Sequence, residues 1–398
     1  MKSVLYISTY LDPITLRYVN IKSGKDVKPS IAAIKYADLI KKGLIKQSDI
    51  ALSNLYLPTL APYPDTKIKC FKRGRTENGS YIPFLNFFFI KQISIVFFLF
   101  IYTLKWILSV GINRRKYIVL SSIQLPFLIA LFLLKLLNVK IISFVPDLPQ
   151  YQFSYTQERS RLKKMFIPLY LLFSKLLFCI IDSYVFISHH MKSFFPNKPF
   201  VVMEGIVDEN EDLSLIVEKT EKFTVMYAGA LYEKFGLKSL LEAFINIKDE
   251  RCELWLFGNG DMVDFIKELS QRDLRIIYWG NKPNRDIVSF EMQATLLVNP
   301  RFSSYEFTKY SFPSKLLEYM SSGTPVLTTK LPCIPEEYLD KMLYFKEETP
   351  EGFRKSIEDC MLMDRAELNA FGARTKKYVV FHKNSVVQLM KIKDFIFA

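Results

Sequence analysis

The sequence predicts an α/β protein of two domains, and three observations support this fold class. Short apolar runs, such as residues 4–8 and 296–299, alternate with longer segments of helical periodicity, the pattern of sheets covered by helices. With 398 residues, the chain is long enough for two domains that each bury a core. A polar, acidic stretch separates the two halves. The expected segments are a first domain, a linker, a second domain and a terminal helix, at residues 1–205, 206–220, 221–375 and 376–398.

The first domain is predicted to consist of strands with helices between them. Its first strand follows Met1-Lys2-Ser3 directly, without the apolar region and small-residue cleavage site of a signal peptide. We therefore expect the protein on the cytoplasmic side. A helix is predicted at residues 30–42 from its apolar spacing. The predicted strands are residues 4–8, 49–52, 117–121, 140–145 and 183–188.

Basic residues are concentrated in the first half of the chain. Residues 1–200 contain 28 Lys and Arg against 9 Asp and Glu, whereas residues 201–398 contain 26 against 31. This asymmetry indicates an anionic partner for the first domain, either nucleic acid or a membrane surface with acidic lipids. The alternative is a soluble basic domain from a lysine-rich proteome.

Apolar segments distinguish between these partners. The region at residues 83–110 is rich in Phe and Ile and is interrupted by Lys91 and Lys105, and two further apolar segments lie at residues 125–137 and 165–181. None has the roughly 18 to 20 uninterrupted apolar residues of a membrane span. Apolar segments flanked by basic residues can instead lie in the membrane interface. We favour a core helix for residues 125–137 and interfacial attachment for residues 83–110. The expected partner is thus an anionic membrane, at the inner face of the plasma membrane, and not nucleic acid.

The spacing of the cysteines and the absence of two motifs argue against several classes of protein. Five cysteines are scattered without paired or metal-ligand spacing, which favours a reducing compartment over a disulfide framework. A P-loop and a Gly-x-Gly-x-x-Gly fingerprint are both missing, which argues against kinases, ATPases and dehydrogenases.

The most informative segment is a helix start, Phe312-Pro313-Ser314-Lys315-Leu316-Leu317-Glu318. Pro313 suits the first helical position, which leaves the amides of Ser314 and Lys315 at the positive end of the helix dipole. Such an end attracts anions, and a diphosphate would account for a lysine in the first turn. Glu318 lies one turn further on the same face and could accept the two hydroxyls of a ribose. The pattern predicts a nucleotide-diphosphate pocket, and the alternative is an ordinary surface helix with an i, i+3 pair.

The flanks of this helix favour the pocket. Residues 296–300 form a short buried strand that ends at a breaker, residues 323–325 stop the helix, and residues 326–329 resume a strand. Open α/β sheets bind nucleotides at a helix N-terminus beyond the carboxyl end of a strand.

In this context the second half resembles the retaining glycosyltransferases of family 4, from residue 221 to about residue 345. The resemblance rests on a strand and glycine loop with Gly229, Lys234 and Gly236, on a second strand and turn at residues 253–260, and on a third strand at residues 276–280. It also includes Asn299-Pro300 before the helix motif. It implies the GT-B fold, two facing Rossmann-like domains with a cleft between them, and a terminal helix that crosses back to the first domain. It implies a nucleotide-sugar donor held by Gly229, Lys234, Ser314, Lys315 and Glu318.

Two departures from the family pattern affect this assignment. The family has two glutamates eight residues apart, and Glu318 corresponds to the second. At the position of the first this chain has Tyr310, so the usual contact to the transferred sugar is missing. Glu306 is the candidate to replace it, unless the sugar is held differently. The family also has a basic residue after the first glycine, where this chain has Ala230. We therefore expect Lys234 and Lys315 to share the diphosphate.

The catalytic residues are harder to assign. Asp147 follows a predicted strand where the family has a cleft-lining residue, so it is the candidate contact for the acceptor or sugar; the alternative is a turn residue before a proline. For His189 and His190 we favour a role at a helix start. No Asp-x-Asp pair occurs, so we expect no metal site and no cofactor, with lysines and helix amides offsetting the charge of the leaving group.

The resulting hypothesis is a membrane-associated transferase that moves a sugar from a nucleotide-sugar to a lipid-linked glycan, as in capsule, O-antigen or exopolysaccharide assembly. Retention of configuration is implied by the resemblance only. Two alternatives remain open: a nucleotide-sugar epimerase of the same fold, and a non-enzymatic membrane-surface scaffold, which would explain Tyr310 and Ala230.

Overall fold

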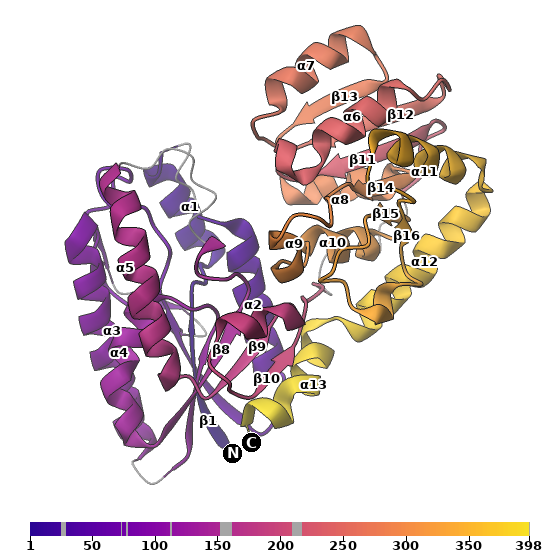
Figure 1. Ribbon diagram of the computed structural model, residues 1–398. Helices are drawn as coiled ribbons and strands as arrows, with labels where there is room; N and C mark the ends of the chain where they lie inside the picture. The colour runs from indigo at the N-terminus through magenta and orange to yellow at the C-terminus, as the bar shows by residue number, and fades with distance from the viewer. Residues whose placement is uncertain are drawn as a thin grey trace. The chain divides into compact units, whose positions relative to one another are not determined.

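The structure, a computed structural model, divides the chain into two compact units (Figure 1). The first unit comprises Met1–Glu204 and the last helix of the chain, and the second comprises Gly205–Asn384. Residues 209–216, most of the predicted linker, lie outside the described residues. The described residues are 1–24, 29–72, 74–76, 79–111, 114–151, 161–208 and 217–397, without the side chains of residues 161–166.

The first unit is built on a sheet of eight described strands in the order β10-β9-β8-β7-β1-β2-β5-β4, parallel except for β4. The central strand β1 is almost inaccessible to solvent, which explains its continuous apolar sequence. All five strands predicted for this half are confirmed. The bounds are β1 Lys2–Ser8, β2 Ile50–Tyr56, β4 Arg75–Thr76, β5 Gly79–Tyr81, β7 Lys116–Leu120, β8 Val139–Val145, β9 Ser183–Phe186 and β10 Phe200–Val202, with a separate antiparallel pair of β3 Cys70–Phe71 and β6 Phe84–Leu85.

Helices cover both faces of this sheet (Figure 1). The helix predicted at residues 30–42 is α2, which starts after Ser30, whose hydroxyl accepts from the Ala33 amide at 3.3 Å, an N-cap bond. Helices α3, α4 and α5 pack side by side. The bounds are α1 Pro13–Lys22, α2 Ile31–Ile45, α3 Phe88–Val110, α4 Leu125–Phe132, η1 Leu133–Leu137, α5 Arg161–Leu177, η3 Phe178–Ile180, η4 His189–Phe194 and α13 Ser385–Phe397.

Two of these helices test the interpretation of the apolar segments. The α3 helix is continuous over 23 residues and is long and apolar enough to cross a membrane. Only 28% of an apolar 18-residue stretch of this helix is buried. The segment at residues 125–137 is only in part the core helix that we favoured. Phe127, Leu128 and Leu131 are buried, but Leu133 and Leu136 are exposed.

The second unit contains a six-stranded parallel sheet in the order β13-β12-β11-β14-β15-β16. Numbered from its own first strand, this is the order 3-2-1-4-5-6 of the Rossmann fold. Alternate residues of β11 point to opposite faces of the sheet. Val225 and Tyr227 belong to one hydrophobic cluster, and Met226 and Ala228 belong to another. The strands predicted in this half are confirmed. The bounds are β11 Phe223–Ala228, β12 Cys252–Phe257, β13 Ile276–Gly280, β14 Leu296–Asn299, β15 Val326–Thr328 and β16 Leu343–Tyr344.

The helices of the second unit follow its strands. They are η5 Glu233–Phe235, α6 Leu237–Ile245, α7 Val263–Arg272, α8 Asn284–Gln293, α9 Phe307–Tyr310, α10 Ser314–Ser322, η6 Glu336–Tyr338, α11 Pro350–Leu362 and α12 Arg365–His382.

The prediction of one terminal helix at residues 376–398 is wrong, because two helices, α12 and α13, meet there. Lys383 explains the break. Its carbonyl accepts from the Val207 amide at 2.8 Å, and its buried ammonium lies 2.6 Å from Glu337. These contacts hold the chain in the second unit up to Asn384, whereas α13 packs against α2 of the first unit.

Candidate donor site

The candidate site lies at the point where the strand order of the second sheet reverses. Strands β11 and β14 are neighbours, and from them the chain proceeds in opposite directions across the sheet. In open α/β sheets, ligands bind outside the carboxyl ends of the strands at such a point. The glycine loop follows β11, and the segment that leads to α10 follows β14.

Glycines allow the backbones of these loops to touch. Gly236 has φ 82°, and a Cβ on it would lie 1.9 Å from the Pro300 carbonyl oxygen. Gly258 has φ 130°, and a Cβ there would lie 1.8 Å from the Gly229 oxygen. Gly229 donates its amide to the Phe257 carbonyl at 3.0 Å, which ties the loop after β11 to the end of β12. No other residue fits at Gly236 or Gly258 without movement of the backbone.

Helix α10 is anchored at the end of β11. The Tyr319 hydroxyl accepts from the Ala228 amide at 2.7 Å and donates to the Ala228 carbonyl at 3.0 Å, fully buried. The helix begins one residue later than predicted. Pro313, expected at the first helical position, is the N-cap with ψ 106°, and Ser314 is the first helical residue. The first amides of the helix still lack acceptors within it, so the anion-binding end remains beyond the sheet.

The structure brings Lys315 and Glu318 together. The Lys315 ammonium donates to the Glu318 carboxylate and lies 3.7 Å from an oxygen of Glu291. The Lys315–Glu318 contact is the i, i+3 pair that an ordinary surface helix would also form. It compensates the charge of the lysine within the protein. It also fixes the direction of the Glu318 carboxylate, as a ribose contact requires.

Glu291 was not among the residues predicted from the sequence. It lies on α8 and is 0% exposed, between the buried residues Val288 and Met292. A carboxylate on the apolar face of a helix was the available signal, because a buried charge needs a partner, and Lys315 supplies one.

The other predicted donor residues have less defined surroundings. Lys234 is exposed on η5, with its ammonium 5.3 Å from the Tyr232 ring centroid and 5.4 Å from that of Phe235. Ser314 is exposed at the start of α10. Glu306 is exposed before α9, and no described contact joins its side chain to Lys315 or Glu318. The roles of these residues stay predictions.

Arg301 is a second residue of this region that was not predicted from the sequence. It follows Pro300 directly after β14, and its guanidinium lies 4.5 Å from the Phe235 ring centroid. The residue thus spans from one loop of the candidate site to the other.

In the first unit, Asp147 follows β8 at the carboxyl edge of the sheet. Burial raises the pKa of its carboxyl group to about 6. Tyr36 of α2 has a buried hydroxyl, and its pKa is raised by burial and by the charges of Glu204 and Asp147. Asp147 therefore belongs to a polar group at this edge, and its contact with an acceptor stays a prediction. His189 and His190 are exposed and begin η4, which confirms the favoured role at a helix start.

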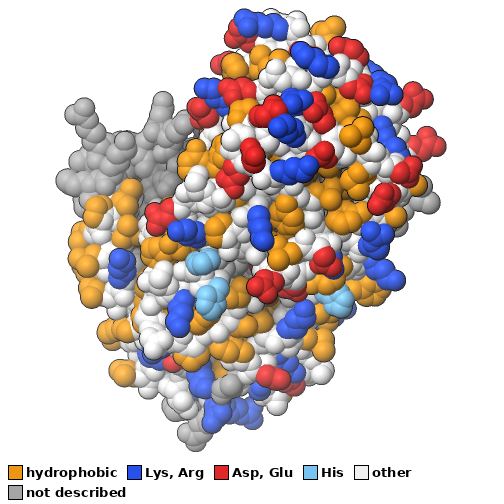
Figure 2. Space-filling model, turned by 45° about the vertical axis from the view of Figure 1, so that its right-hand side comes forward, with side chains coloured by type: hydrophobic (Ala, Val, Ile, Leu, Met, Phe, Trp, Pro, Cys, Tyr) orange, Lys and Arg blue, Asp and Glu red, His pale blue; other side chains and the backbone are white. Residues whose placement is uncertain are grey.

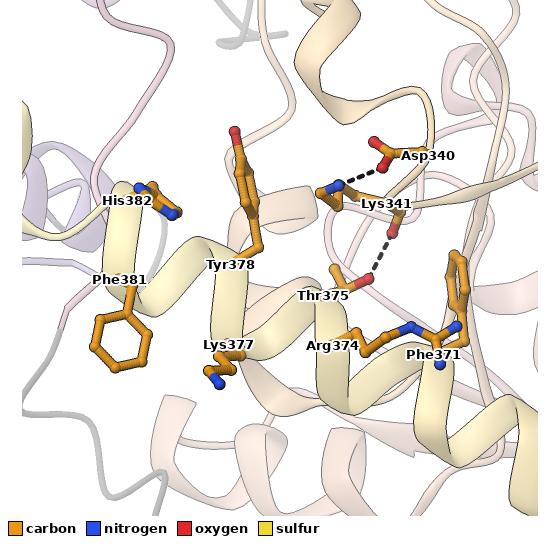
Figure 3. A pocket seen from close by; sticks show the side chains of 9 residues that line it. All are labelled: Asp340, Lys341, Phe371, Arg374, Thr375, Lys377, Tyr378, Phe381 and His382. Atoms are coloured by element: carbon orange, nitrogen blue, oxygen red, sulfur yellow. Dashed lines mark hydrogen bonds and ion pairs between the residues drawn. The ribbon is translucent and has the colours of Figure 1, made fainter.

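A cavity of about 540 Å³ lies elsewhere on the second unit, along α12 (Figure 3). Lys341 and Asp340 form an ion pair at its margin, and Thr375 donates to the Lys341 carbonyl at 3.0 Å. None of the predicted site residues lines it. The candidate donor site at the reversal of the strand order is therefore separate from this cavity. Within the described residues, no three His, Cys, Asp or Glu side chains are grouped to hold a metal ion.

Comparison with known proteins agrees with this geometry. Residues 222–362 match the family model described as glycosyl transferases group 1. This match confirms the enzyme class predicted from the sequence, a glycosyltransferase. A search among proteins of curated function gave no match.

Solved structures resemble the whole chain. A sucrose-phosphate synthase from Thermosynechococcus elongatus has 14% identity and a TM-score of 0.65, over 100% of this chain and 99% of that one. HepE from Anabaena in complex with UDP has 12% identity and a TM-score of 0.59, over 100% of both chains. The lipopolysaccharide outer core galactosyltransferase WaaB has 14% identity and a TM-score of 0.59, over 99% of both chains.

The fold is GT-B. Both Rossmann-like sheets that this fold requires are present, each with its strand order reversed beside its first strand. The matched residues 222–362 of this chain include every residue of the candidate donor site. The narrower assignment to family 4 stays a prediction.

Proposed function

We propose that this protein transfers a sugar, a hexose by resemblance, from a nucleotide-sugar donor to a glycan acceptor. The observation that carries the proposal is the position of α10, with its N-terminus beyond the carboxyl end of β11 and its Glu318 carboxylate held by Lys315. A helix end there binds phosphate, and a fixed carboxylate beside it can accept the ribose hydroxyls.

The chemistry of transfer requires stabilisation of the departing diphosphate. The first amides of α10 and the cations of the site would offset its charge, and no metal or cofactor is needed for that role. Asp147 is the proposed contact for the acceptor or the transferred sugar. Glu306 remains the proposed substitute for the carboxylate missing at Tyr310, and retention of configuration rests on the family resemblance.

A lipid-linked acceptor and a peripheral position on the inner face of the plasma membrane are part of the proposal. Residues 89, 93 and 97 of α3 recur at helical spacing and are each more than half exposed, although all are Phe or Ile. We call the exposed apolar residues of α3, η1 and α5 the three-helix face. It includes Phe89, Ile93, Phe97, Leu133, Leu136 and Leu176.

Charge supports an anionic lipid surface against this face. Helices α3, α4, η1 and α5 contain no Asp or Glu, whereas Lys105 and Lys175 are exposed on α3 and α5. In Figure 2, hydrophobic side chains gather along the visible margin of the first unit, whereas acidic and basic side chains are mixed over the second. Apolar side chains can insert among acyl chains while lysines meet acidic headgroups. A soluble glycan acceptor would not require such a face.

Donor binding by Glu318 variants tests the proposal. Thermal shifts with UDP-, GDP- and dTDP-sugars identify the donor, and we expect Glu318→Gln to weaken its binding by about ten- to a hundredfold, the worth of hydrogen bonds to a charged group. Glu268→Gln on α7, which removes an exposed, Arg-paired carboxylate, is the matched control and should bind as the wild type does.

Three outcomes would contradict the proposal in different ways. Equal binding and transfer by Glu318→Gln and the wild type would show that the donor site is elsewhere. Turnover of the donor without any acceptor would favour an epimerase. No binding of any nucleotide-sugar by the wild type would favour the non-enzymatic scaffold.

A further inference from the structure

The donor site lacks one of the cations that we expected for the diphosphate. Lys315 lies between Glu318 and Glu291, so two carboxylates already compensate its charge. Ala230, in the loop after β11, supplies no charge at all. A diphosphate with two or more negative charges needs more than the helix amides and the exposed Lys234.

Arg301 is a cation whose bonding is incomplete. Its Nε is buried and has no hydrogen-bond partner among the described residues. A buried guanidinium nitrogen without a partner costs free energy, so such an atom in a folded protein calls for a ligand or ion.

The surroundings of Arg301 fix its direction. It follows Pro300, whose carbonyl oxygen is in close contact with Gly236, and its guanidinium stacks 4.5 Å from the Phe235 ring centroid. Phe235 is 5% exposed and is held by the core of the second unit. A planar guanidinium on a fixed ring loses little freedom when it binds phosphate oxygens with two parallel hydrogen bonds.

The charges of Arg301 and Lys315 both influence Tyr227, which lies at the end of β11. Its hydroxyl donates to the Ala230 carbonyl at 3.0 Å. Burial raises the pKa of Tyr227 to about 12, and the charges of Arg301 and Lys315 both oppose that rise. Arg301, at the end of β14, therefore brings positive charge toward the loop in which Ala230 replaces the basic residue of the family.

We propose that Arg301 binds the diphosphate of the donor and is the principal cation of this site. The inference rests on the proposed function, because it names a ligand contact within the same site. Lys315 then serves to orient Glu318, and Lys234 contacts the diphosphate from the opposite loop.

Binding of nucleoside diphosphates and of nucleosides separates this role from a structural one. The probes are UDP, GDP and dTDP, each compared with its free nucleoside by titration calorimetry. We expect Arg301→Gln to weaken binding of the preferred diphosphate by ten- to a hundredfold and to leave nucleoside binding unchanged. Arg301→Lys keeps the charge without the planar fork and should recover part of the loss. Arg272→Gln, an exposed arginine on α7, is the control.

Each outcome decides between the two proposals. Wild-type binding that Arg301→Gln leaves intact would overturn the role of Arg301 and spare the proposed function. Equal losses for diphosphate and nucleoside would show that Arg301 only supports the fold of the pocket, which also overturns the inference. A wild-type protein that binds no nucleoside diphosphate would overturn the proposed function and this inference with it.

Discussion

At the scale of single residues, Asp147 illustrates how burial prepares a carboxyl group for chemistry. Its pKa of about 6 lies above that of an exposed aspartate, because the charged form is desolvated at the end of β8. A carboxyl group that titrates near neutral pH can accept or donate a proton during turnover, which an ordinary aspartate does poorly. The same shift has a consequence for stability.

We predict that Asp147→Asn stabilises the protein at pH 8 by on the order of 2 kcal/mol. The unfolded carboxyl titrates near pH 4, and the folded one near pH 6. Between these values the folded state binds more protons, so the free energy of unfolding of the wild type falls as pH rises. Below about pH 4 both states are protonated, and the variant and the wild type should be equally stable.

Urea unfolding of both proteins from pH 4 to pH 8 measures this difference. A stability difference that does not change with pH would mean that Asp147 is not desolvated. If Asp147 also contacts the acceptor, the stabilised variant will have lost transfer while it still binds the donor.

The residues of the donor site differ in how far the sequence predicts them. Lys315 and Glu318 belong to one helix, so their spacing alone places them on one face. Glu291 and Arg301 come from other segments and reach the site only through the order of the strands. A single sequence does not contain that order, although the buried charge at residue 291 was a visible signal.

At the scale of elements, the strands and most helices could be predicted because apolar runs and breakers are local signals. The errors occurred at the ends of elements. Helix α10 starts after Pro313, and the terminal helix breaks at Lys383, which hydrogen bonds and an ion pair hold in the second unit. The outward side chains of η1 were also missed, since periodicity cannot show which apolar face lacks a covering element.

The contact between the two loops of the donor site leads to a prediction for Gly236. Gly236→Ala must place a Cβ 1.9 Å from the Pro300 oxygen, so the loops have to separate. Gly280→Ala is a matched control, because it has a similar φ of 74° but open space around the new Cβ. We expect the control to cost about 1 kcal/mol from backbone strain and Gly236→Ala to cost about 3 kcal/mol or more.

Chemical unfolding of the two variants measures the costs, and nucleoside diphosphate titration measures the effect on the site. Gly236→Ala should also weaken diphosphate binding, since Arg301 and Lys234 would move apart. Equal stability of the two variants would show that the loops can separate freely.

At the scale of the whole molecule, the chain divides its chemistry between its two units. The second unit carries the proposed donor site and nearly balanced charges, and the first carries the excess of basic residues and the three-helix face. This division suits an enzyme that takes a soluble donor and an acceptor embedded in a membrane. The composition alone indicated the division, but only the structure shows that apolar side chains of α3, η1 and α5 are exposed to solvent.

We predict that substitution of Phe89, Phe97 and Leu136 by serine reduces association with anionic vesicles at least tenfold. Each of these side chains is more than half exposed, and insertion of a large apolar side chain into the acyl region contributes about 1.5–3 kcal/mol. Co-sedimentation with vesicles that contain phosphatidylglycerol measures the effect, and salt should release the wild type only in part because screening weakens the lysine contacts alone. Serine at Leu274 and Leu362, exposed leucines of the second unit, provides the control. Unchanged sedimentation of the triple variant, or full recovery of the wild type in the soluble fraction, would remove the membrane from the proposal and leave the donor site in place.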